Sequence, residues 1–185
     1  MSIGGDLQQA IASGELMPLP MRLETDPQNR VMLLSKEIQG LVLGPYLTTA
    51  HEVRAHRLWA DLESFVRGEN VSMSLTPMKA KAAAFGLLNP VGSATFDFRS
   101  RDPSPSLRML GHFHAADCFV ALTWWPKRIN VDWSPKEPLG DDPLKWRLAM
   151  HECGRHWFKL LPNSVPISGL KGEKYVSSKL FIVRP

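Results

Sequence analysis

The stretch ATFDFRSR (94–101), LRMLGHFH (107–114) and CFVALTWW (118–125) contains three runs rich in residues that favour β-strands. The connections between them, DPSPS (102–106) and AAD (115–117), are short and consist of residues common in turns. Because short connections join antiparallel neighbours, we expect two hairpins and a small antiparallel sheet at about residues 94–125.

The two faces of this sheet differ in chemistry. Side chains alternate between faces along a strand, so the phenylalanines at 96 and 98 point to one side, which belongs to the core. The other side collects three arginines and two histidines on adjacent strands: Arg99, Arg101, Arg108, His112 and His114.

Two interpretations of this polar face remain open. Like charges on neighbouring strands repel, and an anion bound between them would relieve the repulsion. Arginine suits phosphate in particular, because its planar fork donates two parallel hydrogen bonds. The alternative is a solvated sheet face on which Asp97 and Asp102 neutralise part of the charge.

The rest of the chain predicts an α+β fold. Apolar residues recur at helical spacing in three segments, at about 27–43, 49–66 and 143–160. Short strands are expected near 17–23 and 179–183, and an Ala-rich piece from Lys79 to Leu88 favours a short helix. We therefore expect two N-terminal helices packed on the small antiparallel sheet, followed by a C-terminal helix and tail.

The expected organisation is a flexible N-terminus (1–16), one α+β domain (17–161) and a C-terminal tail (162–185). The chain has 185 residues, a formal charge of +4 and ordinary globular composition. Two cysteines cannot build a disulfide framework, and the start lacks the basic and apolar regions of a secretory signal. These features predict a cytoplasmic protein without a membrane span.

The segment LRMLGHFHAADCFVALTWWPKR (107–128) resembles the last strands of the RelE/ParE-like toxin family. Arg108 opens a strand, residues 115–117 form a turn, an apolar strand follows, and Lys127-Arg128 supplies a basic pair. The resemblance covers about residues 27–130. The chain departs from the family in its greater length, and Trp133 or Ser134 stands where some family nucleases carry a tyrosine.

The resemblance implies a toxin of a toxin–antitoxin pair that acts on RNA, as a metal-independent mRNA endonuclease, with RNA or the ribosome and an antitoxin protein as partners. Arginines would stabilise phosphate charge and a histidine would move protons. The candidate catalytic residues for such a cleavage are Arg99, Arg108 and Arg128 for the phosphate charge and His112 or His114 for proton transfer. The implied nucleic-acid-binding residues are Arg101, Lys127, Trp125 and Trp133.

Other interpretations stay open. The same fold would serve a non-enzymatic protein-interaction domain, such as a phage or plasmid accessory protein, or a nucleic-acid-binding domain without catalysis. Zinc binding is a weaker alternative, and we expect no metal or cofactor. The potential zinc ligands do not form a known zinc motif: His112, His114, Cys118, His151, Cys153 and His156.

Overall fold

The two hairpins predicted from the sequence form the middle of a larger sheet. The computed structural model describes residues 5–77, 82–129 and 132–183. Within them, β5 (Phe96–Ser100), β6 (Leu107–Ala115) and β7 (Cys118–Pro126) pair antiparallel, as expected. Five further strands extend the sheet on both sides: β1 (Leu16–Pro18), β2 (Val31–Ser35), β3 (Val71–Ser74), β4 (Phe85–Leu87) and β8 (Leu180–Ile182).

The expectation of a small antiparallel sheet is wrong. The sheet has eight strands in the order β1-β2-β7-β6-β5-β4-β3-β8, and it is mixed. β2 runs parallel to β7, and β3 runs parallel to both β4 and β8. A mixed sheet arises because segments distant in the sequence add to each side of the local hairpins, and their direction is not limited by a short turn.

Residues 31–35 explain part of this error. Val31, Leu34 and Ile38 fit helical spacing, so the sequence predicted one helix over this region. Instead, residues 31–35 form β2, and the helix begins only at Lys36. The side chain of Ser35 caps that helix and donates a hydrogen bond to the carbonyl of Leu122 on β7. A short apolar run fits a buried strand as well as a helix, and pairing with β7 decides the outcome.

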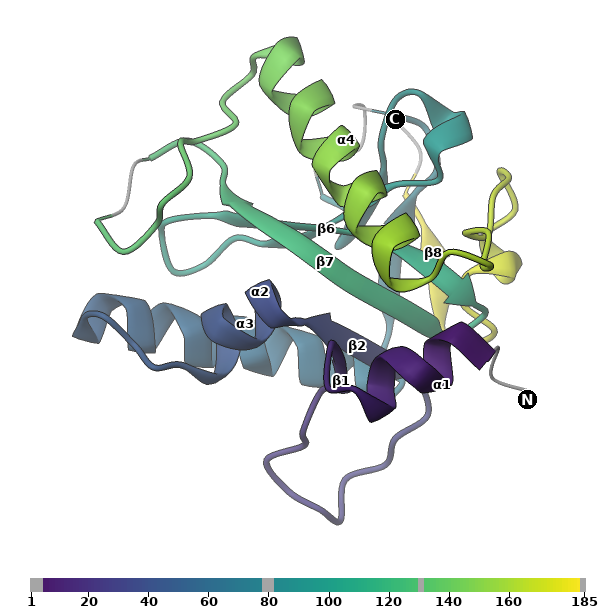
Figure 1. Cartoon of the computed structure of the whole chain (residues 1–185), viewed down its shortest axis with the longest axis horizontal. Coiled ribbons are helices and arrows are strands. Elements are labelled where there is room, and N and C mark those ends of the chain that lie inside the picture. Colours follow the sequence, from purple (N-terminus) through teal and green to yellow (C-terminus); the bar gives the residue numbers. More distant parts are fainter. Residues whose placement is uncertain (1–4, 78–81, 130–131, 184–185) are drawn as a thin grey trace.

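Helices cover both faces of the sheet rather than one. α2 (Lys36–Leu43) and α3 (Thr49–Val66) pack on one face, whereas α1 (Gly5–Ala12) and α4 (Pro143–Leu160) pack on the other (Figure 1). α3 and α4 match their predicted ranges. Two short 3-10 helices, Val91–Ser93 and Gly172–Lys174, complete the regular structure of the described residues.

α4 covers the face that was expected to be open to solvent or to an anion. Ala149, Met150, Cys153 and Trp157 form its buried stripe. This stripe belongs to the same core cluster as apolar side chains of the two central strands: Leu110, Val120 and Leu122. These aliphatic residues lie on the face that also carries the polar groups, so covering it removes apolar area from water.

The first and last segments of the described residues are both part of the fold. The N-terminal segment was expected to be flexible, but residues 5–12 form α1, whose Leu7 and Ala10 join the core cluster under α4. In the expected tail, Tyr175 and Val176 are buried in the opposite cluster, and β8 pairs with β3. Of the expected Ala-rich helix, Phe85–Leu87 is instead strand β4, and residues 78–81 lie outside the described part.

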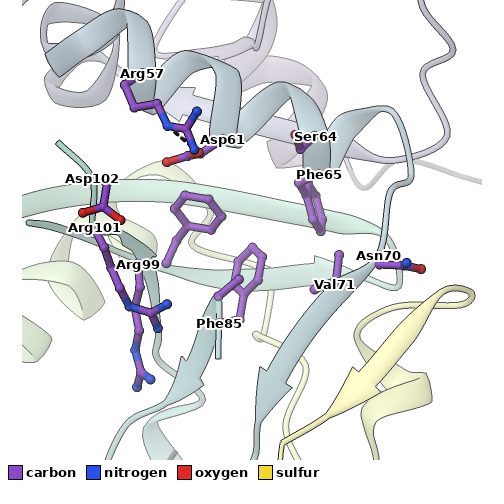
Figure 2. Close-up of a pocket in the computed structure, with 12 residues that line it drawn as sticks. Arg57, Asp61, Ser64, Phe65, Asn70, Val71, Phe85, Arg99, Arg101 and Asp102 are labelled. Carbon is purple, nitrogen blue, oxygen red and sulfur yellow. Dashed lines mark ion pairs between the residues drawn. The ribbon is translucent and has the colours of Figure 1, made fainter. Parts of the chain in front are cut away.

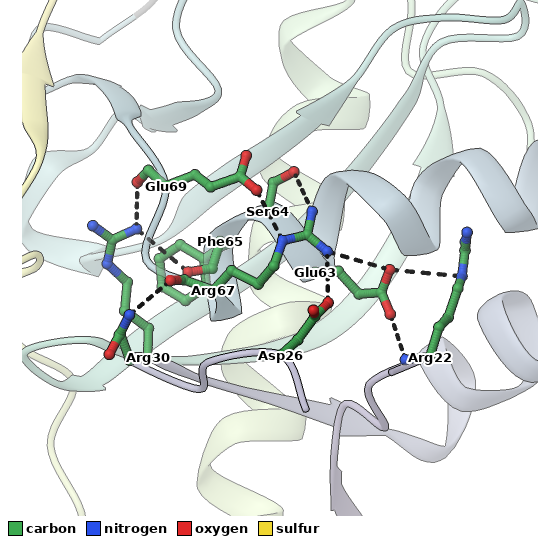
Figure 3. A network of polar contacts seen from close by, with 9 residues as sticks. Arg22, Asp26, Arg30, Glu63, Ser64, Phe65, Arg67 and Glu69 are labelled. Atoms are coloured by element: carbon green, nitrogen blue, oxygen red, sulfur yellow. Dashed lines mark hydrogen bonds and ion pairs between the residues drawn. The ribbon is translucent and has the colours of Figure 1, made fainter. Parts of the chain in front are cut away.

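A buried arginine ties four segments together beside β2. Arg30 donates hydrogen bonds to the carbonyls of Phe65 and Glu69 near the end of α3 and to that of Ser178 before β8. Its Nε lies 3.4 Å from Oδ1 of Asp117 in the β6–β7 turn. Figure 3 shows this arginine beside a second network, in which Arg67 lies between Asp26, Glu63 and Glu69. Carbonyl and carboxylate partners make the burial of this cation tolerable.

The packing of α4 on the sheet gives a direct test. Trp157→Ala should lower the free energy of unfolding by about 3–5 kcal/mol, because it empties a fully buried site between α4 and β6. Phe158→Ala, one residue later on the exposed side, should change it by less than about 0.5 kcal/mol. Urea unfolding followed by circular dichroism measures both, and equal effects would contradict the placement of α4.

Candidate functional site

Four arginines gather at one end of the central hairpins. Arg99 on β5 lies directly opposite Arg108 on β6, so strand pairing brings their side chains to the same face. Arg101 and Arg128 also lie close enough for their positive charges to act on Arg108. We call these four residues, Arg99, Arg101, Arg108 and Arg128, the arginine cluster. They meet because the end of β5, the start of β6 and the end of β7 lie at the same end of the antiparallel sheet.

Asp97 is the buried counter-charge of the cluster. Its Oδ2 accepts a hydrogen bond of 2.8 Å from Nε of Arg99 and lies 3.7 Å from Nε of Arg108. The carboxylate is almost completely buried, so the two arginines compensate a charge that would otherwise be costly in the interior. From the sequence, Asp97 was expected only to neutralise part of a solvated face.

Gly86 makes room for the cluster. A Cβ atom at this position would lie 2.0 Å from Nη2 of Arg99 and 2.5 Å from Oδ1 of Asp97. Gly86 pairs with Asp97 in the β4–β5 register, so the Arg99 guanidinium can lie across the backbone of β4 only because this residue has no side chain. Glycine in a strand often marks such a close approach, but the sequence alone did not identify it.

Arg108 is the least satisfied member of the cluster. Its side chain is 12% exposed. Burial lowers the pKa of its guanidinium to about 10, with Asp97 opposing this shift and the neighbouring arginines adding to it. Its Nε and Nη1 are buried and find no hydrogen-bond acceptor among the described residues. Buried donors without acceptors are costly, so this group is suited to receive an anion.

The other two arginines of the cluster, Arg101 and Arg128, are exposed to solvent. Arg101 is exposed and its Nη2 donates a hydrogen bond to the carbonyl of Ala83. Arg128 has a side chain that is 70% exposed, and its Nη2 lies 4.0 Å from Oδ2 of Asp141. The same carboxylate accepts a hydrogen bond from Nζ of Lys127, which therefore has a local structural partner. The arginine cluster thus runs from a buried pair to an exposed rim.

A cation from α3 holds the connection between β5 and β6. Arg54 donates hydrogen bonds to the carbonyls of Ser100 and Pro105, and its side chain is buried. Burial lowers its pKa to about 10, with Asp61 opposing the shift. Because both carbonyls flank the exposed loop 101–104, Arg54 fixes the strand ends from which Arg99, Arg101 and Arg108 project.

A pocket of about 260 Å³ adjoins the cluster between α3 and the ends of β4 and β5. Figure 2 shows Arg99 and Arg101 extending away from α3, whereas Phe85 points toward it. On α3, Arg57 pairs with Asp61, which also accepts a hydrogen bond from Ser100. These polar groups of α3 already have partners within the protein, so the arginine cluster is the stronger candidate for a binding site.

His112 is not exposed to solvent beside the arginines. It is only 2% exposed and lies under α4, with its ring 5.1 Å from that of Trp157. Four residues separate it from Arg108 along β6, which corresponds to about 13 Å at the usual strand rise. The expectation that His112 shares one catalytic site with Arg99 and Arg108 is therefore wrong. The reason is that α4 covers this part of the face.

The hydrogen bonds of His112 fix its protonation. Nδ1 lies 3.1 Å from the carbonyl of Ala94 and must donate to it, which leaves Nε2 as an acceptor 3.6 Å from Sγ of Cys153. Burial raises the pKa of the Cys153 thiol, so the S–H group is retained and can donate to Nε2. Burial also lowers the pKa of His112 to about 4. The ring is a neutral core group at physiological pH.

Of the remaining expected site residues, Trp125 pairs directly with Arg108 across β6 and β7, whereas His114 and Trp133 pack against other parts of the fold. His114 is half-buried against Trp157, and burial lowers its pKa against the opposing influence of Asp6. Trp133 is buried, with its ring stacked on that of His51 at 4.5 Å. Trp125 is buried as well, and the ammonium group of a lysine lies 3.8 Å from its ring centre. Neither tryptophan offers an open ring for stacking on a base.

The residues considered as zinc ligands do not assemble. His112 and Cys153 contact each other, but within the described residues no three His, Cys, Asp or Glu side chains lie close enough to hold a metal ion. The same part of the chain contains no helix of the length and apolar character needed to cross a membrane. The arginine cluster therefore stands as the main candidate site.

Comparison with known proteins identifies no matching family model, no similar curated protein and no similar solved structure. The resemblance to RelE/ParE-like toxins thus stays a hypothesis that rests on residues 107–128 and their surroundings. Conclusions about function depend on the geometry of the cluster itself.

The buried histidine predicts a pH dependence of stability. Its folded pKa of about 4 lies below the unfolded value of about 6.5, so the unfolded chain binds the additional proton as the pH falls. The contribution of the neutral His112 to the free energy of unfolding is thus fully present above pH 6.5. It is lost as the pH falls from 6.5 to 4, by up to about 3 kcal/mol. Urea unfolding of wild type and His112→Gln at pH 7 and pH 4 measures this difference. Parallel losses in both proteins would contradict the burial of a neutral imidazole.

Proposed function

We propose that this protein binds RNA through the phosphate groups, using the arginine cluster, and that it is the RNA-directed toxin of a toxin–antitoxin pair. The cluster supports binding of a phosphodiester, and the resemblance of residues 107–128 to RelE/ParE-like toxins favours RNA as the polyanion. In this role the arginines bind phosphate and stabilise its charge.

One observation carries this proposal. Arg108 keeps two buried N–H groups without an acceptor among the described residues, beside a carboxylate that it shares with Arg99. A phosphate bound at the exposed 12% of this side chain would reduce the repulsion among the guanidinium groups, and a small turn of the Arg108 guanidinium would let its oxygens accept from these N–H groups. Arg101 and Arg128 on the exposed rim are suited to contact neighbouring phosphates of an extended strand.

His112 has no part in the proposed chemistry. It is buried, and its Nε2 faces Cys153 rather than solvent. An acid or base for cleavage must reach the 2′-hydroxyl or the leaving oxygen within hydrogen-bond distance. The Cα atoms of Arg108 and His112 lie about 13 Å apart along the strand. The cluster therefore supports binding and electrostatic stabilisation, with proton transfer left to groups other than this histidine.

Salt dependence of RNA binding tests the proposal. Arg101→Ala and Arg128→Ala remove exposed charges, so they should weaken binding of a single-stranded RNA and reduce the log–log salt slope. The expected reduction is about 0.7 for each phosphate that the variant no longer neutralises. Fluorescence anisotropy across a range of NaCl concentrations measures both quantities. Arg108 is unsuitable for a first test, because its removal weakens the compensation of the buried Asp97.

The matched control is Arg155→Ala, which removes an exposed arginine from the C-terminal half of α4, whereas Arg128 contacts Asp141 just before the opposite end of this helix. This variant should retain the wild-type slope. Equal weakening by all three substitutions would indicate diffuse attraction of RNA to a basic protein, and an unchanged slope for Arg101→Ala and Arg128→Ala would refute the site.

If the protein is a toxin, its expression should arrest growth. Expression of the wild-type chain should slow bacterial growth, and the double variant Arg101→Ala/Arg128→Ala should relieve this effect while accumulating to the same level. Growth curves with immunoblots measure both properties. Equal growth with and without the wild-type protein would count against a toxin, while RNA binding in vitro could still support the nucleic-acid-binding alternative.

A further inference from the structure

The outer surface of α4 carries a stripe of apolar side chains opposite its buried stripe. Leu144, Leu148 and Phe158 are 55%, 61% and 59% exposed. With His151 and Arg155 they follow spacings of four, three, four and three residues, which is the periodicity of a helix–helix seam. At a rise of 1.5 Å per residue, the stripe from Leu144 to Phe158 is about 21 Å long. We call these five residues the outer stripe.

Along α4 itself, the charges around the outer stripe are almost all positive, and the exposed Asp141 and Asp142 precede the helix. Arg155 lies within the stripe, and Arg147 and Lys159 lie beside it, all of them exposed. Glu152 is the one acidic residue of α4, and it already accepts a hydrogen bond of 2.9 Å from Lys136. The face therefore combines apolar side chains with cations that a carboxylate from another molecule could neutralise.

We propose that the outer stripe is the docking surface for an acidic amphipathic helix of a partner protein. Apolar side chains of that helix would cover Leu144, Leu148 and Phe158, in the way that amphipathic helices use residues at i, i+3, i+4 and i+7. Carboxylates of the partner would pair with Arg147, Arg155 and Lys159. The inference stands apart from RNA binding, since the arginine cluster includes no residue of α4.

Charge complementarity favours an acidic helix over a second copy of the chain or a lipid surface. A second copy of α4 would bring the same cations toward each other across the seam, at an electrostatic cost. A lipid surface would meet an apolar stripe that His151 and Arg155 interrupt between Leu148 and Phe158. A protein helix can place a carboxylate opposite Arg155 and apolar groups on either side of it, which satisfies both parts of the face.

Two synthetic peptides of three heptads test the proposal. Both carry leucine at the a and d positions, and their e and g positions carry glutamate in one peptide and lysine in the other. The full-length protein should bind the glutamate peptide at least about tenfold more tightly than the lysine peptide, as judged by fluorescence anisotropy at low salt. Leu148→Ser and Arg155→Glu should each weaken binding of the glutamate peptide by about tenfold or more.

The matched control is Leu170→Ser, an exposed leucine outside α4, which should leave peptide binding unchanged. All three variants should keep the wild-type melting temperature and RNA-binding salt slope, which separates this test from that of the proposed function. Failure of the glutamate peptide to bind, equal binding of both peptides, or binding that survives Leu148→Ser would overturn the proposal.

Two further measurements address the other occupants. Sedimentation velocity that shows a wild-type dimer abolished by Leu148→Ser would overturn the proposal and assign the surface to a second copy. Co-flotation with phosphatidylcholine–phosphatidylserine vesicles that Leu148→Ser abolishes would overturn it in favour of a membrane. We expect a monomer in the first measurement and no flotation in the second.

Discussion

The structure depends on the burial of the β6–β7 hairpin on both faces. Phe113 and Phe119 face the core under α2 and α3, while Leu110 and Val120 face the core under α4. Two strands with apolar residues on alternating faces cannot leave either side in water without exposing a large apolar area. This requirement places helices on both sides and makes the hairpin the middle of a mixed sheet.

The same burial separates the polar residues of β6 into two environments. His112 lies under α4, where its ring accepts and donates local hydrogen bonds and stays neutral. Arg108 lies at the strand end, where Arg101 and Arg128 reach solvent. Residues that share one face of one strand thus serve different purposes, and the position of α4 decides which side chains can meet a ligand.

α4 has a role on each of its faces. Its inner side, with Cys153 and Trp157, closes the core over β6 and β7. Its outer side presents Leu148 and Phe158 among positive charges. The RNA site and the docking surface proposed for this protein therefore lie on separate parts of one framework. A partner bound along the outer stripe would contact α4 without contacting the core that positions Arg108.

Local patterns in the chain were enough to predict α3 and α4 from apolar periodicity, the β5–β7 hairpins from short turns, and the shared face of Arg99 and Arg108 from strand alternation. The strand at residues 31–35 and the burial of His112 became visible only in the folded molecule. Periodicity reports which residues share a face, but the segment that covers the face comes from a distant part of the chain. Contacts of that kind leave no signal in neighbouring residues.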